Sequence, residues 1–426
     1  MKTLSLLMLL ALGWLAAVAQ QELRIHQINV GDGDATLVGI FDPISKKYTK
    51  TILIDGGKSA AASKILPYLK NVLGGEVPKL DYVALTHYHD DHYKGLMALG
   101  EGGMRADSVI DQGGYEMSLI FPQQTTLVSS DQKPAAMTVF TGWTDMLKMA
   151  VENGYLKGHV KGMFHYGAGS ETDLGRKLLL GKIGNELVTL ECVAGWGNTL
   201  GGDVVIPNPS PGKSSPNNFT LAFVLQFGQF RYFIGGDLGG DRGSSYIDQE
   251  TPLTSFFAHA YPSSWSWNHT KEKAGHVCGF KANHHGSSYS NGDSFMAAMS
   301  PAICMISAGK NASWKLPRPR VIEGFSAAVP LSEWTALSSK NYGKGLYVTN
   351  LFDFTGFKSK TTATALFSGK PGLSFSYGNR DDGATSSYMV RVETSMIAEQ
   401  SQFQVFRVDD TGSSTKLLAN YFCHVK

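Results

Sequence analysis

This chain of 426 residues has only four cysteines, a formal net charge of +2 and few long apolar segments. The four cysteines, Cys192, Cys278, Cys304 and Cys423, lack C-x-x-C spacing, so a zinc-thiolate knuckle is not expected. Their pairing stays open, because an exported protein can hold disulfides while apolar strands also bury free thiols. Basic and acidic residues number 38 and 36, so the overall charge does not favour tight non-specific binding to nucleic acid.

The longest apolar run lies at the N-terminus and is too short for a membrane span. Lys2 supplies a positive charge, the run extends from Leu4 to Val18, and small residues precede Gln20. This arrangement is typical of a secretory signal peptide. We therefore expect residues 1–19 to be removed and the mature protein to be secreted or periplasmic, without a transmembrane segment. A retained N-terminal anchor is the alternative.

Short strand-like runs dominate the rest of the sequence, and its 48 glycines suit the turns between them. Apolar patterns predict a helix at 60–73 and strands at 23–28, 35–41, 50–54 and 81–85. The pattern weakens from 100 to 215, and a second half then has predicted strands at 220–228, 231–237, 277–282 and 302–308. This alternation predicts an α/β fold with sheets inside and helices outside.

The C-terminal part reads differently, because glycine, serine and aspartate separate its strand-like runs. Strands are predicted at 345–354, 387–393 and 403–408. We therefore expect one large domain from 22 to 330 and a small β-rich extension, or appendage, from 331 to 426.

The strongest chemical signal is the run T-H-Y-H-D-D-H at 86–92, directly after a predicted buried strand. Three imidazoles and a carboxylate are ligands that a borderline divalent cation prefers. His87 and His89 can point the same way and share one ion. Asp91 and His92, entering a helix, project toward a second position, typically about 3.5–4 Å away in two-metal sites. Solvated histidines in a surface loop are the alternative.

Further short motifs follow other predicted strands: V-G-D-G-D-A at 30–35, I-D-G-G at 54–57, G-D at 236–237 and N-H-H-G-S at 283–287. Together with the histidine motif they resemble the metallo-β-lactamase superfamily. The H-H-G-S run and the G-D-G-D turn favour the branch that includes the hydrolase domain of the DNA-uptake protein ComEC. The resemblance runs from about residue 24 to 325 and implies a four-layer αββα sandwich with two bound divalent metal ions.

The resemblance also implies roles for individual residues. The expected metal ligands are His87, His89, Asp91, His92, Asp237 and His284, with Asp237 bridging the two ions. His284 is favoured as a ligand of the second ion because it is the first histidine beyond the strand. His285 would then act on a substrate oxygen, as a catalytic residue beside Asp91 and Asp237. The reverse assignment of the two adjacent histidines stays open.

Other positions are expected to support the centre. Asp34 and Asp55 would orient metal-bound imidazoles by accepting their second N–H, although plain turn residues would look the same. Ser287 and Ser288 form a donor-rich turn that can contact a phosphate, and a simple turn is the alternative.

One departure from the family pattern concerns the metal. Asn217 and Asn218 stand where many members have another metal-binding histidine, and Asn218 is expected beside the centre. An amide oxygen is a poorer zinc ligand than imidazole, so manganese stays a candidate beside zinc.

The implied chemistry is hydrolysis by a metal-bound hydroxide, and no G-x-S-x-G motif suggests a serine nucleophile. The ComEC-like motifs favour a phosphodiesterase or nuclease. A small or single-stranded substrate is favoured over a long duplex, because the net charge is near zero and Arg318 and Arg320 are the only hint of a basic patch. Hydrolysis of a β-lactam or lactone is the first alternative, since fold alone does not select the substrate. A non-enzymatic binding protein with a structural metal is the second.

Overall fold

The computed structural model describes residues 20–111, 143, 145, 147, 160–162, 177–195, 197–204, 215–241, 246–259, 277–309, 313–327, 344–350, 373–377, 386–393 and 402–422. The predicted signal peptide, residues 1–19, lies outside these ranges. Within them, no helix combines the length and apolar character needed to cross a membrane.

The first sheet grows in both directions from the N-terminal strand β1 (Glu22–Gln27). On one side follow β2 (Thr36–Asp42), β3 (Lys47–Ile54), β4 (Lys79–Ala84), β5 (Arg105–Asp111) and β6 (Val160–Gly162). On the other side follow β16 (Ser387–Glu393), β17 (Gln402–Val408) and β18 (Thr415–Phe422). The strands from β18 to β3 pair antiparallel, and those from β3 to β6 pair parallel.

The second sheet has parallel pairs at one end and antiparallel pairs at the other. Its order is β15 (Leu373–Tyr377), β14 (Lys344–Val348), β13 (Ile303–Ile306), β12 (Gly279–Lys281), β11 (Phe230–Ile234), β10 (Ala222–Phe227), β8 (Glu186–Gly195) and β7 (Lys177–Ile183), with β9 (Asn198–Thr199) paired to β8. The strands from β11 to β15 run parallel.

Alternating side chains build the core between the two sheets. Along β2, Val38 and Ile40 pack against the second sheet in one buried cluster, whereas Leu37 belongs to a separate cluster on the helical side. On β3, Ile52 belongs to the cluster between the sheets and Leu53 to the cluster on the helical side. Because successive side chains of a strand point to opposite faces, a strand that is apolar at every position is buried on both faces.

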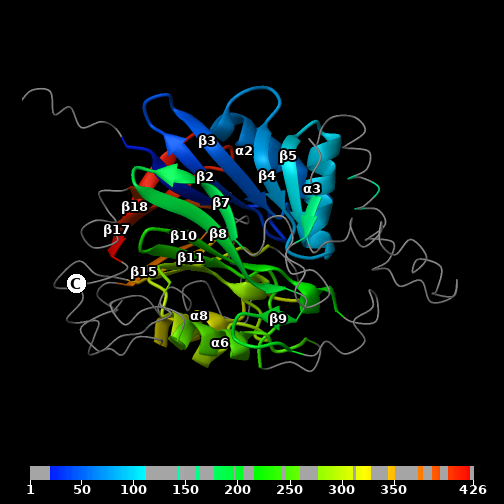
Figure 1. Ribbon diagram of the computed structural model, residues 1–426, viewed down its shortest axis with the longest axis vertical. Coiled ribbons are helices and arrows are strands. Elements are labelled where there is room, and N and C mark those ends of the chain that lie inside the picture. Colours follow the sequence, from blue (N-terminus) through cyan, green and yellow to red (C-terminus); the bar gives the residue numbers. More distant parts are fainter. Residues whose placement is uncertain are drawn as a thin grey trace, which may run out of the picture.

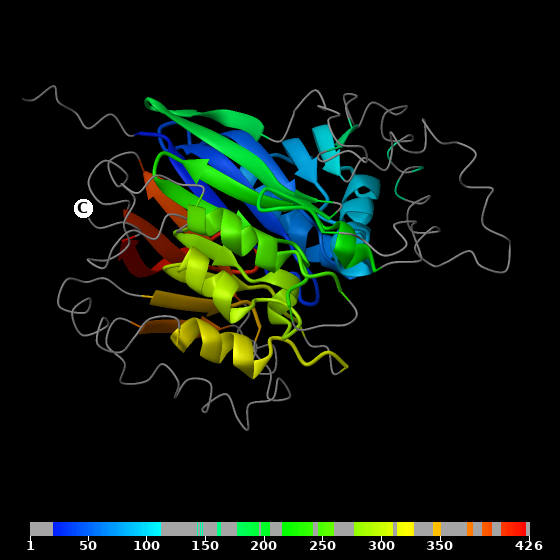
Figure 2. The same cartoon turned by 60° about the horizontal axis from the view of Figure 1, so that its bottom comes forward.

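Helices cover the outer faces of both sheets. The helices α2 (Ala62–Leu73) and α3 (Asp90–Glu101) pack on the first sheet, and α6 (Glu250–His259), α7 (Asp293–Met299) and α8 (Pro319–Ala327) pack on the second. Figure 1 shows α2 and α3 beside β3 to β5, with α6 and α8 under the second sheet. Figure 2 turns these green-to-yellow helices toward the viewer. The predicted four-layer sandwich is thus confirmed.

The C-terminal segment does not form the separate appendage expected for residues 331–426. Its strands β14 and β15 extend the second sheet, while β16 pairs directly with β1 and brings β17 and β18 into the first sheet. Val390 and Phe403 lie in the central core between the sheets. These strands are therefore structural parts of the sandwich, because the N-terminal strand β1 would otherwise have an unpaired edge.

Two cysteines, Cys192 and Cys304, are buried free thiols, whereas Cys278 is disulfide-bonded. Cys423 lies outside the described residues. The free thiols lie in strands of the second sheet, where each behaves as a small apolar side chain.

Candidate metal centre

The histidine motif leaves the end of β4 as an extended loop and enters α3. His89 is extended, with φ −86° and ψ 148°, and precedes the first helical residue, Asp90. The loop brings the Nε2 atom of His87 to 3.1 Å from the Nδ1 atom of His89. Two ring nitrogens therefore converge on one point, as the spacing of the motif predicts.

His92 is positioned by close packing of α3 against the turn that follows β3. Gly95 donates its amide to the carbonyl of Gly57 at 2.8 Å, and a Cβ at Gly95 would lie 1.7 Å from the carbonyl oxygen of Gly56. This approach brings Nδ1 of His92 to 2.8 Å from Oδ2 of Asp55. The Asp55 carboxylate also accepts from the backbone amide and hydroxyl of Thr86.

The contact between Asp55 and His92 fixes the imidazole. Because a carboxylate accepts, Nδ1 of His92 carries the proton and Nε2 faces the centre without one in the neutral ring. Asp55 therefore contacts the ring nitrogen of His92 that does not face Asp237, and its role in orienting a metal-bound imidazole stays a prediction.

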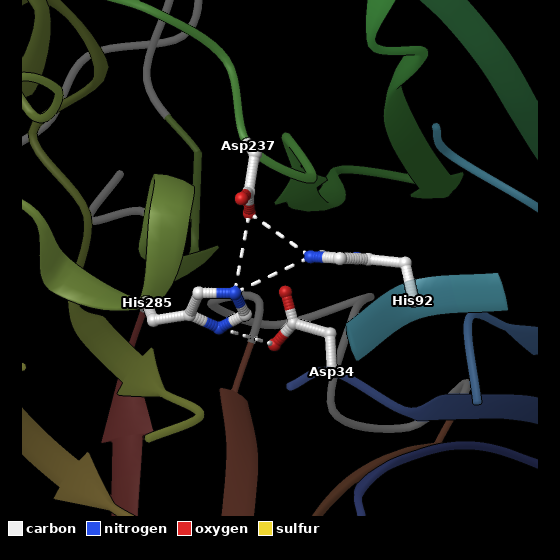
Figure 3. Close-up of side chains that lie close together, drawn as sticks. All are labelled: Asp34, His92, Asp237 and His285. Atoms are coloured by element: carbon white, nitrogen blue, oxygen red, sulfur yellow. Dashed lines mark hydrogen bonds and ion pairs between the residues drawn. The ribbon is translucent and has the colours of Figure 1, made fainter. Parts of the chain in front are cut away.

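Asp237 lies between four histidines at the turn after β11, and its side chain is buried. Its Oδ1 atom is 3.3 Å from Nε2 of His92 and 3.5 Å from Nε2 of His285. Its Oδ2 atom is 3.7 Å from Nε2 of both His87 and His284. The two carboxylate oxygens therefore face different pairs of imidazoles. Figure 3 shows Asp237 opposite His92 and His285.

The adjacent histidines occupy a backbone conformation that the sequence did not predict. After β12, His284 and His285 both have positive φ, 49° and 53°, and Gly286 follows with φ 79°. Non-glycine residues rarely adopt this region, and consecutive ones mark a strained segment held by its surroundings. The amide of His284 donates to the carbonyl of Gly236 at 3.0 Å, which joins this loop to the turn carrying Asp237.

The structure groups His285, rather than the favoured His284, with the expected second metal position. Nε2 of His285 lies 3.4 Å from Oδ2 of Asp91 and 3.3 Å from Nε2 of His92. Its other nitrogen, Nδ1, lies 3.1 Å from the carbonyl of Ser307. His284 was favoured only as the first histidine beyond the strand, whereas the left-handed backbone at both residues brings the ring of His285 to Asp91 and His92.

Asp34 contacts a lysine that the sequence analysis overlooked. Its Oδ1 atom lies 3.7 Å from Nδ1 of His285, and its Oδ2 atom forms a short ion pair with Nζ of Lys281. The same Nζ donates to the carbonyl of Gly236 at 3.3 Å. Lys281 is only 1% exposed, and its single charge within an otherwise apolar strand was the available signal.

Glu250, in the first turn of α6, is a second residue that the sequence analysis overlooked. Its carboxylate accepts from the side chain of Asn283 and the amide of Asn291, both at 2.7 Å, and from the amide of Gly292 at 2.8 Å. Burial, only partly offset by these three donors, raises the pKa of Glu250 to about 7. The residue holds both ends of the loop that carries His284 and His285.

Of the remaining predicted residues, Asn218, Ser287 and Ser288 contact Ile247, Tyr289 and Arg320, respectively. Asn218 accepts from the amide of Ile247 at 2.8 Å, and the buried side chain of Asn217 has no hydrogen-bond partner among the described residues. The hydroxyl of Ser287 accepts from the amide of Tyr289 at 3.2 Å. Ser288 offers its carbonyl to Arg320 at 3.4 Å.

The electrostatics of the cluster match a site for cations. Burial opposes protonation of His92, yet Asp237 and Asp55 outweigh it and raise its pKa to about 10. The pKa of His285 is also raised, against burial, by Asp237 and Asp34. Burial lowers the pKa of His284 to about 4 and that of His87 well below its usual value. Without metal, protons on two imidazoles balance the carboxylates, and metal binding would release them.

The donor set fits divalent metal ions. Ligand atoms of His87, His89 and Asp237 lie within 4.8 Å of one another, and so do those of Asp34, His92, Asp237 and His285. Oδ1 of Asp237 is buried and has no hydrogen-bond partner in the part of the chain that the structure describes. An acceptor left unsatisfied in a buried site is costly unless a cation or donor occupies the space beside it. Imidazoles and carboxylates in two sets sharing one aspartate suit two such ions.

Comparisons with known proteins match part of the chain to one family model. The family model described as Metallo-beta-lactamase superfamily matches residues 30–103, which include Asp34, Asp55 and the whole histidine motif. Among solved structures, the chain is similar to one titled "Crystal structure of hydrolase AbOPH in beta lactamase superfamily", with 15% identity and a TM-score of 0.25. That similarity covers 48% of this chain and 56% of the other. A search of curated proteins found no match. The ComEC-like branch stays a prediction.

Proposed function

We propose that this chain, whose residues 30–103 match the family model described as Metallo-beta-lactamase superfamily, is a metal-dependent hydrolase, and more specifically an exported phosphodiesterase acting on small or single-stranded substrates. The observation that carries the proposal is the position of Asp237, whose two oxygens face two separate pairs of histidines. Zinc is the proposed metal, with manganese as the alternative, and two ions are expected.

When bound, two divalent ions lower the pKa of a shared water toward neutrality and neutralise charge developing on substrate oxygens. The protein supplies their ligands from separate loops. His87 and His89 would hold one ion, Asp91, His92 and His285 the other, and Asp237 both. Asp55 fixes the ring of His92, and the backbone carbonyl of Ser307 fixes that of His285.

The charge of the centre supports an anionic substrate. Four carboxylates contact its imidazoles, and Lys281 supplies one positive charge, which leaves three negative charges when the imidazoles are neutral. Two divalent ions would add four positive charges, so the loaded centre would have an excess of one before its shared water is deprotonated and none afterwards. In the first state, a buried positive centre attracts a phosphodiester monoanion more strongly than a neutral ester or lactam.

The accessible side of the centre supports a substrate that carries a ring. Asp91 and His284 have side chains 23% and 15% exposed, whereas His87, His92 and Asp237 are buried. The ring of Tyr246 packs edge-on against that of His284, with the ring centroids 5.1 Å apart. The ring centroid of the exposed Tyr289 lies 6.0 Å from that of Tyr246. Aromatic faces beside a phosphate site can stack a nucleobase or an aryl group.

Export is part of the proposal. The signal-like N-terminus supports it, and so does the disulfide at Cys278, because disulfides persist mainly in oxidising compartments.

The direct test is hydrolysis of bis-p-nitrophenyl phosphate by the purified mature chain, beside nitrocefin and a lactone. We expect chelator-sensitive cleavage of the phosphodiester, restored by zinc or manganese. Asp237→Asn should lower kcat/KM by about 1000-fold, since the metals supply several kcal/mol of transition-state stabilisation. Asp42→Asn, in an exposed turn where Asp42 binds Ser45, is the control and should retain activity. Preferred cleavage of nitrocefin or the lactone would favour the alternative function, and full activity of Asp237→Asn would refute the mechanism.

A further inference from the structure

The two adjacent histidines face opposite oxygens of the same carboxylate. His285 approaches Oδ1 of Asp237 at 3.5 Å, whereas His284 approaches Oδ2 at 3.7 Å. Their rings are 6.2 Å apart and inclined by 71°, so they do not stack or share one contact. The left-handed backbone at both residues is what turns consecutive side chains toward different sides of Asp237.

Each oxygen of Asp237 is shared with one histidine of the first motif. Oδ1 faces His92 as well as His285, and Oδ2 faces His87 at the same 3.7 Å as His284. His87 converges with His89 on the first metal position. His284, which shares Oδ2 of Asp237 with His87, therefore lies on the side of the first metal position, away from His92.

The first position also lacks a protein ligand where the family resemblance leads one to expect a histidine. Asn217 and Asn218 hold that place, and the side-chain oxygen of Asn218 is already engaged by the amide of Ile247. His87, His89 and Asp237 give three protein donors, and a fourth imidazole would complete a tetrahedral set. His284 lies outside the group whose ligand atoms are all within 4.8 Å of one another, so its Nε2 atom, 3.7 Å from Oδ2 of Asp237, would move toward the first ion on metal binding.

His284 is held where such a ligand is needed. Its backbone amide is bonded to the carbonyl of Gly236, the residue before Asp237. Tyr246 packs edge-on against its ring and limits rotation. The Glu250 carboxylate accepts a hydrogen bond from the side chain of Asn283, the residue directly before His284.

We propose that His284 is a ligand of the first metal, so that the adjacent histidines are divided between the two ions and His284 replaces the missing histidine. The inference rests on the dinuclear centre of the proposed function, but it concerns metal binding and not the substrate. The role given earlier to the non-ligating histidine, contact with a substrate oxygen, is the competing assignment.

Metal stoichiometry in single and double variants separates these assignments. Chelator-treated full-length mature protein would be titrated with Zn²⁺ against a chromophoric chelator, which counts bound ions without using activity. The wild type should bind two ions, and His284→Ala should lose one, with at least about 100-fold weaker affinity at that position. His87→Ala/His284→Ala should still bind one ion, because both changes affect the same position. His92→Ala/His284→Ala should bind none.

Other outcomes overturn the assignment. If His284→Ala binds two ions with wild-type affinities while KM or kcat changes, His284 contacts substrate. If His87→Ala/His284→Ala binds none while His92→Ala/His284→Ala binds one, His284 serves the second position. Thermal unfolding of each metal-free variant, compared with the metal-free wild type, checks that the loss of an ion does not reflect loss of the fold. His284→Gln, which keeps a donor of weaker affinity, should restore part of the binding of His284→Ala. A wild type that binds two ions but fails to cleave phosphodiesters would refute the proposed function and leave this inference intact.

Discussion

Replacing Glu250 by glutamine should remove a pH-dependent loss of stability that the buried carboxylate causes. Its pKa is raised from 4.5 to about 7, chiefly by burial. Because the folded protein holds this proton more tightly than the unfolded chain, the stabilisation is complete below pH 4.5 and is lost as the pH rises through about 7. At 1.36 kcal/mol per pKa unit, the difference amounts to about 3 kcal/mol. Solvent does not screen it, since Glu250 is 2% exposed.

Urea unfolding of the chelator-treated protein across this pH range measures the effect. Glutamine resembles the protonated acid, so the stability of Glu250→Gln relative to wild type should rise by about 3 kcal/mol between the two ends of the range. The metal-facing histidines also titrate, but they do so in both proteins and cancel in the difference. Glu76→Gln, at a side chain that is 98% exposed, should keep the wild-type pH dependence. Parallel pH profiles for wild type and Glu250→Gln would refute the reasoning.

Three further substitutions test the supports of the centre. Asp55→Asn should weaken the binding of one metal ion by about 10–100-fold, because Asp55 fixes Nδ1 of His92. An unchanged metal affinity in a chelator competition would contradict this. Lys281→Met should lower the free energy of unfolding in urea by about 3–5 kcal/mol, because Asp34 would stay buried without its lysine. Adding Asp34→Asn should recover most of that free energy, and a loss below about 1 kcal/mol would count against the ion pair. Gly95→Ala should lower the free energy of unfolding by about 1–3 kcal/mol or more, since its Cβ would lie 1.7 Å from the carbonyl of Gly56; an unchanged thermal midpoint would show that α3 can shift freely.

Much of the fold follows from local patterns that the chain obeys. Strands predicted at 23–28, 35–41 and 81–85 correspond to β1, β2 and β4, because apolar side chains there alternate or run continuously into the core. The predicted helix at 60–73 corresponds to α2 and the short turn before it. By contrast, β5, β7 and β8 lie in the region read as weakly patterned. In β7, exposed and buried residues alternate at an edge strand, and glycine and lysine dilute the apolar signal.

The place of the C-terminal strands could not be read from the sequence. The strands β16 and β17 were predicted, but the pairing of β16 with β1 joins residues more than three hundred positions apart. Strand propensity says where a strand forms and not which edge it joins. The same limit applies to β14, whose partner β13 belongs to the large domain.

The centre itself was foreseeable in composition but not in detail. Polar residues at the ends of β11 and β12 meet because these strands run parallel in the second sheet, and the end of β4 in the first sheet faces them. The division between His284 and His285 depends on two positive φ angles that no sequence pattern specified. Lys281 and Glu250 were missed because neither has its partner nearby in the sequence. Their partners, Asp34 and Asn283, are 247 and 33 positions away.

Anomalous diffraction from crystals of the zinc-loaded protein tests the central claim most directly. We expect two peaks on opposite sides of the Asp237 carboxylate, one beside His87 and His89 and the other beside His92 and His285. A single peak, or peaks away from Asp237, would contradict a shared dinuclear centre at this position.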